Sequence, residues 1–172
     1  MNLPNILTIS RFFLIPIFLF VFFFLEYEIV AFVVFLLAGL TDIVDGYIAR
    51  KYDLVTEMGK LLDPLADKLM MLTAIISLLI VGKIPWFVAG LVFFREIGMI
   101  FSAIFFHVKG KKTVPANKLG KSTTVLFYIA ILMITFQLPY DIEFLSFVVA
   151  FSFLTSMVYL IEVRRANKEL EI

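Results

Sequence analysis

Six long apolar stretches restrict the folds that are open to this sequence. They lie at about residues 7–25, 29–49, 61–81, 84–107, 120–138 and 142–163. Each has roughly the 20 mostly apolar residues that an α-helix needs to cross the hydrocarbon core of a bilayer. Strands of a membrane barrel would alternate polar and apolar residues, whereas the run RFFLIPIFLFVFFFL is apolar on every face. The pattern therefore predicts an all-α integral membrane protein with six transmembrane helices.

The composition supports a membrane protein and leaves little chain for a separate soluble domain. Apolar residues make up 62% of the 172 residues and charged residues 17%, whereas soluble domains are roughly half apolar and a quarter charged. We therefore expect one membrane domain over residues 1–172, with its six helices in one bundle. The first stretch is too long for a secretory signal and lacks a cleavage site, so we expect it to remain as a span. The net charge of +1 does not indicate nucleic-acid binding, and the absence of cysteine excludes disulfides.

Basic residues fall on alternate sides of the six stretches, and this predicts the orientation. One side has nearly all of them: Arg11, Arg50, Lys51, Lys60, Lys109, Lys111, Lys112, Lys118, Lys121, Arg164, Arg165 and Lys168. The other side has Lys83. Because loops rich in lysine and arginine stay in the cytoplasm, we expect both termini to be cytoplasmic. We expect the location to be the plasma membrane of a bacterium.

Four aspartates stand at matched spacings where the second and third stretches approach the cytoplasmic side. Asp42 and Asp45 are three residues apart, and Asp63 and Asp67 are four apart, so each pair lies on one helical face. The two helices are neighbours joined on that side, which lets the pairs converge at one depth. Ionisable residues inside a membrane are costly and usually functional. Carboxylate oxygens favour hard cations, so we predict a Mg²⁺ or Mn²⁺ site, with Ca²⁺ as a competitor.

Small residues and an arginine accompany the aspartates. These are Gly46, Ala49, Arg50 and Gly59. Small side chains permit close approach and a guanidinium binds phosphate, so this set favours a flat anionic ligand over a bare ion. A proton or cation transporter would also use paired membrane carboxylates, and Asp63 before Pro64 could be a simple cap in the first turn of a helix. The residues alone leave these alternatives open.

The same positions resemble the signature of the CDP-alcohol phosphotransferases, DxxDGxxAR(x)8GxxxDxxxD. The match has no gap and comprises Asp42, Asp45, Gly46, Ala49, Arg50, Gly59, Asp63 and Asp67. The resemblance extends over most of the chain, because that family also has six transmembrane helices and cytoplasmic termini. It implies a metal-dependent transfer of a phosphatidyl group from CDP-diacylglycerol to an alcohol, with release of CMP.

The resemblance also implies roles for individual residues. The four aspartates Asp42, Asp45, Asp63 and Asp67 would hold Mg²⁺ or Mn²⁺, as two ions, and Asp67 would in addition be the general base. The CDP group would contact Asp42, Gly46, Ala49, Arg50, Thr56, Gly59, Asn5 and Thr8. Members of the family commonly form homodimers, so a second copy of the chain is an expected partner.

The N-terminal segment indicates a subgroup of the family. The run NLPNILTISRFF resembles the PNxxTxxR segment of bacterial phosphatidylglycerophosphate synthases and of the related cardiolipin synthases. Under this resemblance Arg11 would contact the nucleotide or the lipid surface. The alternative is that Arg11 simply snorkels to the membrane interface.

Three basic residues indicate a phosphorylated acceptor alcohol. Arg95, Lys118 and Lys121 would form a cationic pocket for the phosphate of glycerol 3-phosphate. Adjacent helical residues do not face each other, so we do not expect Arg95 to pair with Glu96. The run GKSTT lacks the second lysine and the glutamine of the GKxKTxxQ-like run of phosphatidylglycerophosphate synthases. Phosphatidylglycerol as acceptor, which would give cardiolipin, therefore stays an alternative.

Overall fold

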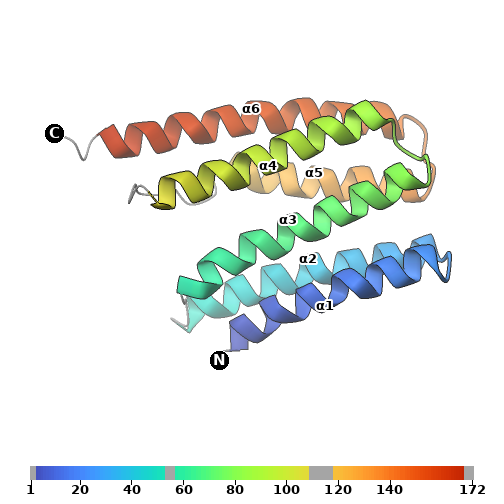
Figure 1. Ribbon diagram of the computed structural model, residues 1–172, viewed down its shortest axis with the longest axis horizontal. Coiled ribbons are helices and arrows are strands. Elements are labelled where there is room, and N and C mark those ends of the chain that lie inside the picture. Colours follow the sequence, from blue (N-terminus) through green and yellow to red (C-terminus); the bar gives the residue numbers. More distant parts are fainter. Residues whose placement is uncertain (1–2, 53–56, 109–117, 169–172) are drawn as a thin grey trace. The chain divides into compact units, whose positions relative to one another are not determined.

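The computed structural model describes residues 3–52, 57–108 and 118–168, and within these ranges every regular element is a helix. The helices are α1 (Leu3–Phe23), α2 (Glu28–Lys51), α3 (Glu57–Ile80), α4 (Trp86–Val108), α5 (Lys118–Thr135) and α6 (Asp141–Lys168) (Figure 1). The predicted all-α class and six helices are confirmed. The helices belong to two compact units, Met1–Lys83 and Ile84–Ile172. The single six-helix bundle stays a prediction.

Three helices extend four or five residues beyond the apolar stretches that predicted them. α1 begins at Leu3 rather than at residue 7. α3 begins at Glu57 rather than at residue 61, and α6 continues to Lys168 rather than ending at residue 163. Asp63 therefore lies in the second turn of α3, and the alternative that it is a simple cap in the first turn of a helix is wrong. Hydropathy detects the part of a helix that suits lipid, whereas the backbone hydrogen bonds of a helix continue through polar residues as well.

In the first unit, α1 packs against both α2 and α3, and the three helices run alternately in opposite directions (Figure 1). Its core combines large apolar side chains with small ones: Phe18, Phe22, Ala31, Phe35, Ala38, Ala66, Ala74 and Ile75. Helices in lipid associate through close packing, and small residues at the contact allow their backbones to approach. Where α2 begins and α3 ends, the unit is held by an ion pair between Lys83 and Glu28. The turn beside this ion pair contains Gly82, whose φ is 74°.

In the second unit, α6 packs against both α4 and α5. The buried apolar side chains include Val88, Ala89, Val92, Phe127, Ala130, Ile134, Leu145 and Val148. Buried hydroxyls follow one another on α6, at Ser152 and Thr155, and Thr123 of α5 is buried as well. This unit therefore has a polar seam inside an otherwise apolar interior.

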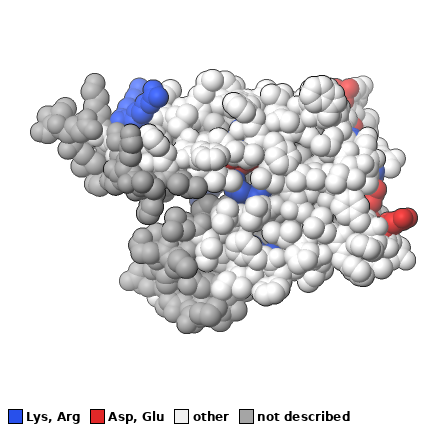
Figure 2. Space-filling model, viewed as in Figure 1, with Lys and Arg blue, Asp and Glu red and all other residues white. Residues whose placement is uncertain are grey.

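The exterior of the described chain is mainly apolar. Large exposed side chains include Phe13, Phe24, Trp86, Phe94 and Phe101, and few charged side chains are visible on the face in Figure 2. Glu28–Ala49 and Asp141–Arg165 are long and apolar enough to cross a membrane, and Thr8–Phe23 and Leu119–Thr135 are shorter apolar helices. An exterior of this kind is consistent with a membrane protein.

Candidate active site

An arginine of α1 lies between two of the four motif aspartates. Asp42 and Asp45 occur one turn apart near the end of α2, and Arg11 donates hydrogen bonds to both. Its Nη1 pairs with Oδ1 of Asp42, and its Nη2 lies 2.8 Å from Oδ2 of Asp45. The two carboxylates therefore converge on one cationic group, as their spacing on one helical face predicts.

Burial distinguishes this cluster from a surface ion pair. The side chains of Arg11 and Asp45 are 1% and 2% exposed, whereas that of Asp42 is 37% exposed. A charge that has lost its water must be paired and hydrogen-bonded. The alternative that Arg11 snorkels to the membrane interface is therefore wrong. Thr8, one turn before Arg11 on α1, is also buried.

The third helix of the unit carries the other motif aspartates. Asp67 lies on α3 with a half-buried side chain, and Gly59 lies in the first turn of that helix. Thr56 lies outside the described residues, and so do the side chains of Asp63, Asn5 and Arg50. Among the side chains that the structure describes, no three acidic or histidine groups lie close enough to hold a metal ion. The site of four carboxylates thus stays a prediction.

The chemistry of the Asp42 and Asp45 pair fits a divalent cation. Both carboxylates already share one positive group, the Arg11 guanidinium. Carboxylate oxygens are the ligands that Mg²⁺ and Mn²⁺ prefer. Asp42 and Asp45 could therefore contribute oxygen ligands to one shared ion. Gly46 and Ala49, on the following turn of α2, are half-buried, and residues as small as these permit close approach of another group.

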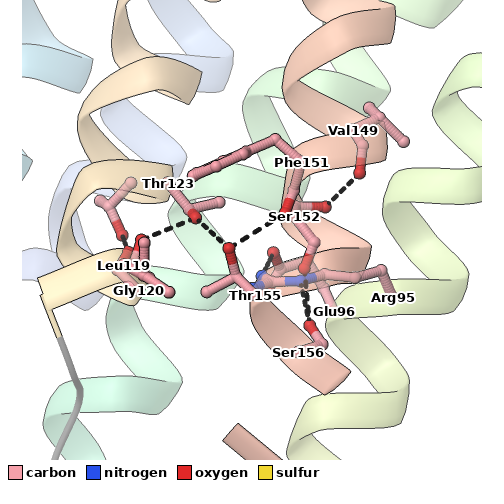
Figure 3. Close-up of polar contacts among 11 residues, drawn as sticks. Arg95, Glu96, Leu119, Gly120, Thr123, Val149, Phe151, Ser152, Thr155 and Ser156 are labelled. Atoms are coloured by element: carbon pink, nitrogen blue, oxygen red, sulfur yellow. Dashed lines mark hydrogen bonds and ion pairs between the residues drawn. The ribbon is translucent and has the colours of Figure 1, made fainter. Parts of the chain in front are cut away.

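A second charged cluster lies between α4 and α6 (Figure 3). Arg95 donates from Nε to Oγ of Ser156 at 3.0 Å and from Nη1 to Oε1 of Glu96. The expectation that these adjacent residues would not pair was wrong. Arg95 is 8% exposed and Glu96 is 1% exposed, so both charges have lost their water. Pairing then outweighs the poor geometry of neighbouring positions, because both side chains are long enough to bend toward each other.

Hydroxyl groups connect α5 to α6 in the same seam (Figure 3). Oγ1 of Thr123 lies 3.1 Å from Oγ1 of Thr155. Ser156 donates back to the carbonyl of Ser152 at 2.9 Å, which places its oxygen to accept from Arg95. These hydroxyl residues were not predicted from the sequence. A signal was available, because Ser152, Thr155 and Ser156 recur at three- and four-residue spacing in an apolar helix.

The remaining predicted acceptor residues lie on α5. Lys118 is the first residue of this helix, with its side chain outside the described residues, and Lys121 is exposed one turn later. Arg95, in contrast, is buried with Glu96 and Ser156. The pocket formed by Arg95, Lys118 and Lys121 stays a prediction.

Comparison with known proteins identifies relatives over most of the chain. The CDP-alcohol phosphatidyltransferase family model matches residues 1–160. A probable phosphatidylglycerophosphate synthase of Mycobacterium tuberculosis is 36% identical, and the alignment covers 76% of this chain and 64% of that protein. CDP-diacylglycerol--glycerol-3-phosphate 3-phosphatidyltransferases of Rickettsia bellii and Aquifex aeolicus are 39% and 36% identical; the alignments cover 77% and 84% of this chain and 75% and 82% of those proteins.

Proposed function

Since the chain belongs to the CDP-alcohol phosphatidyltransferase family, we propose that it transfers a phosphatidyl group from CDP-diacylglycerol to glycerol 3-phosphate. The products are phosphatidylglycerophosphate and CMP, in a reaction of phospholipid biosynthesis. The observation that carries the proposal is the convergence of Asp42 and Asp45, two positions of the family signature, on one cation. The choice of acceptor follows the names of the relatives.

The four motif aspartates have two roles in this reaction. Asp42, Asp45, Asp63 and Asp67 would hold two Mg²⁺ or Mn²⁺ ions, which would neutralise the pyrophosphate of the donor. Asp67, half-buried on α3, accepts the proton of the acceptor hydroxyl. The acceptor oxygen then forms a bond to the phosphorus that carries the lipid, and the bond from that phosphorus to CMP breaks. The electron pair of that bond leaves with CMP.

Other residues bind and orient the donor. Small side chains on α2 and α3 allow the nucleotide to approach the backbone, and polar side chains bind its phosphates and base. The set is Asn5, Thr8, Asp42, Gly46, Ala49, Arg50, Thr56 and Gly59. Holding the donor in line with the acceptor converts the transfer into an effectively unimolecular step.

The acceptor phosphate binds to basic residues of the second unit. Arg95, Lys118 and Lys121 supply the positive charge, and Arg95 exchanges its contacts with Glu96 and Ser156 for the phosphate oxygens. A guanidinium suits this exchange because its donors match phosphate as well as they match a carboxylate. Phosphatidylglycerol would require a groove open to lipid in place of this pocket.

The membrane arrangement follows from the same proposal. All six helices cross the cell membrane, both termini lie in the cytoplasm, and the aspartates face the cytoplasmic side, where water-soluble acceptors and CMP can exchange. Two copies of the chain form a homodimer. The strong bias of lysine and arginine toward one side of the helices supports this orientation.

An acceptor panel tests the proposal. The detergent-solubilised chain is given CDP-diacylglycerol and Mg²⁺ with glycerol 3-phosphate, phosphatidylglycerol, serine or inositol phosphate, and CMP release and lipid mass are measured. We expect CMP release with glycerol 3-phosphate and the mass of phosphatidylglycerophosphate. Release with phosphatidylglycerol alone would instead identify a cardiolipin synthase. Ion flux into liposomes without CMP release from any acceptor would identify a transporter and refute the proposal.

A further inference from the structure

We propose that Arg11 is a built-in counter-ion of the metal site. Its guanidinium neutralises Asp42 and Asp45 while divalent ions are absent, and it competes with those ions for the same carboxylates. Arg11 is thus a positioning residue that sets metal affinity. This inference rests on the proposed function, because it takes Asp42 and Asp45 as metal ligands.

The contact of Arg11 with Asp42 and Asp45 has a geometry that fixes both carboxylates. The two Nη atoms of Arg11 bind different carboxylates, Oδ1 of Asp42 and Oδ2 of Asp45. A guanidinium is a rigid planar fork, so spreading its two arms over two residues fixes the separation of the carboxylates. The arginine also comes from α1 rather than from α2. It therefore joins two helices through the two aspartates that the metal would use.

The burial of Arg11 and Asp45 makes their pairing necessary. Arg11 and Asp45 have almost no exposed side-chain surface, so water cannot replace a lost partner. Without Arg11 the two neighbouring carboxylates would repel each other, and Asp45, which is 2% exposed, would lose a cationic partner while remaining buried. The metal-free protein thus needs a positive charge at this position, and Arg11 supplies it.

Competition with metal follows from the same charges. A guanidinium a few ångströms from a divalent ion repels it, and each carboxylate oxygen that binds Arg11 is less available to a metal. Removing the positive charge should therefore strengthen metal binding and weaken the metal-free fold. An arginine with a purely structural role predicts a different pattern, in which stability falls equally with and without metal.

The experiment compares Arg11→Gln and Arg11→Lys with the unaltered chain in detergent. Arg95→Gln is a matched control, because Arg95 is also a buried arginine paired with a carboxylate, in the other unit. Mn²⁺ binding is measured from the paramagnetic resonance signal of the free ion. Thermal unfolding is followed by helical circular dichroism in EDTA and in saturating Mg²⁺.

We expect Arg11→Gln to bind Mn²⁺ more tightly by on the order of tenfold. It should unfold at a lower temperature than the unaltered chain in EDTA. Saturating Mg²⁺ should raise its unfolding temperature by more than it raises that of the unaltered chain. Arg11→Lys keeps the positive charge but loses the planar, two-armed guanidinium. Its Mn²⁺ affinity should therefore lie between those of Arg11→Gln and the unaltered chain. Arg95→Gln should lower the unfolding temperature equally in EDTA and in saturating Mg²⁺, and its Mn²⁺ affinity should equal that of the unaltered chain.

Several results would overturn the inference, and they are distinguishable. Equal Mn²⁺ affinity in Arg11→Gln and the unaltered chain would remove the role of Arg11 and leave the metal site intact. Weaker Mn²⁺ binding, or failure of both Arg11 variants to fold even in Mg²⁺, would also contradict it, because metal should replace the missing charge. If neither protein takes up Mn²⁺, the metal site of the proposed function is itself wrong.

Discussion

Asp67 is the residue on which the proposed transfer depends most directly. It lies on α3, four residues after Asp63, and its side chain is half-buried. A general base needs access to the acceptor hydroxyl and an ionised carboxylate, and partial burial permits both. Asp45, in contrast, is buried against Arg11, which suits a residue that holds a cation and not one that exchanges a proton with a substrate.

We therefore expect Asp67→Asn to lower the rate of CMP release by roughly 10²–10⁴-fold, because an amide cannot accept the proton. The measurement is the initial rate of CMP release with CDP-diacylglycerol, Mg²⁺ and glycerol 3-phosphate. Glu143→Gln is the control, since Glu143 is an exposed carboxylate in the first turn of α6. Turnover by Asp67→Asn within a few-fold of the control would refute the role of Asp67 as base.

The site could be predicted from the sequence only where a single helix determines it. The three-residue spacing of Asp42 and Asp45 is enough to put both on one face of α2, and both reach the same guanidinium. Arg11 was not predicted as their partner, because its position depends on how α1 packs against α2. Arg95 and Glu96 were predicted not to pair, because helical geometry alone takes no account of the water that both charges lose on burial.

At the scale of helices, α5 and α6 are joined by a hydrogen bond that competes with their own backbones. Thr123 contacts the Leu119 carbonyl at 2.9 Å, and Thr155 contacts the Phe151 carbonyl at 3.0 Å. The two hydroxyls also lie 3.1 Å apart. Each hydroxyl has one hydrogen, so only two of these three contacts can be donated at once. The bond between the helices should therefore be weak.

A double-mutant cycle measures that bond. We expect Thr123→Val and Thr155→Val to show a coupling free energy of about 0.6 kcal/mol, and no more than about 1.7 kcal/mol, in reversible unfolding in detergent. The control cycle pairs Thr155→Val with Thr135→Val, because Thr135 donates to Ile131 of its own helix far along α5. A coupling free energy in the control cycle as large as that between Thr123 and Thr155 would show that the coupling does not arise from the contact of these two hydroxyls.

The helices themselves could be predicted more fully than their ends. Runs of about 20 apolar residues predict both the type and the number of elements, and all six helices are found. The beginnings of α1 and α3 and the end of α6 were missed because residues 3–6, 57–60 and 164–168 include polar or charged side chains. Hydropathy does not detect such residues, yet the backbone hydrogen bonds of a helix continue through them.

At the scale of the whole molecule, the distribution of charge predicts how the chain crosses the membrane. The ion pair of Lys83 with Glu28 puts the turn after α3 beside the start of α2. Arg11, Asp42 and Asp45 lie toward the opposite end of α2. A membrane protein with its aspartates on the cytoplasmic side would then place Glu28 and Lys83 outside.

The absence of cysteine from the sequence allows this topology to be tested without background labelling. Single cysteines replace exposed residues on each predicted side: Lys51 and Lys121 inside, Tyr27 and Tyr140 outside. In intact spheroplasts, a maleimide that cannot cross the membrane should label Tyr27→Cys and Tyr140→Cys. It should label Lys51→Cys and Lys121→Cys only after permeabilisation, because the positive-inside rule keeps these basic loops in the cytoplasm. CMP release by Tyr27→Cys, Tyr140→Cys and Lys51→Cys verifies that these variants are inserted and folded. For Lys121→Cys the fold is verified by helical circular dichroism, because Lys121 belongs to the proposed acceptor pocket. Labelling of Lys51→Cys in sealed cells would place the aspartates of α2 outside and contradict a cytoplasmic active site.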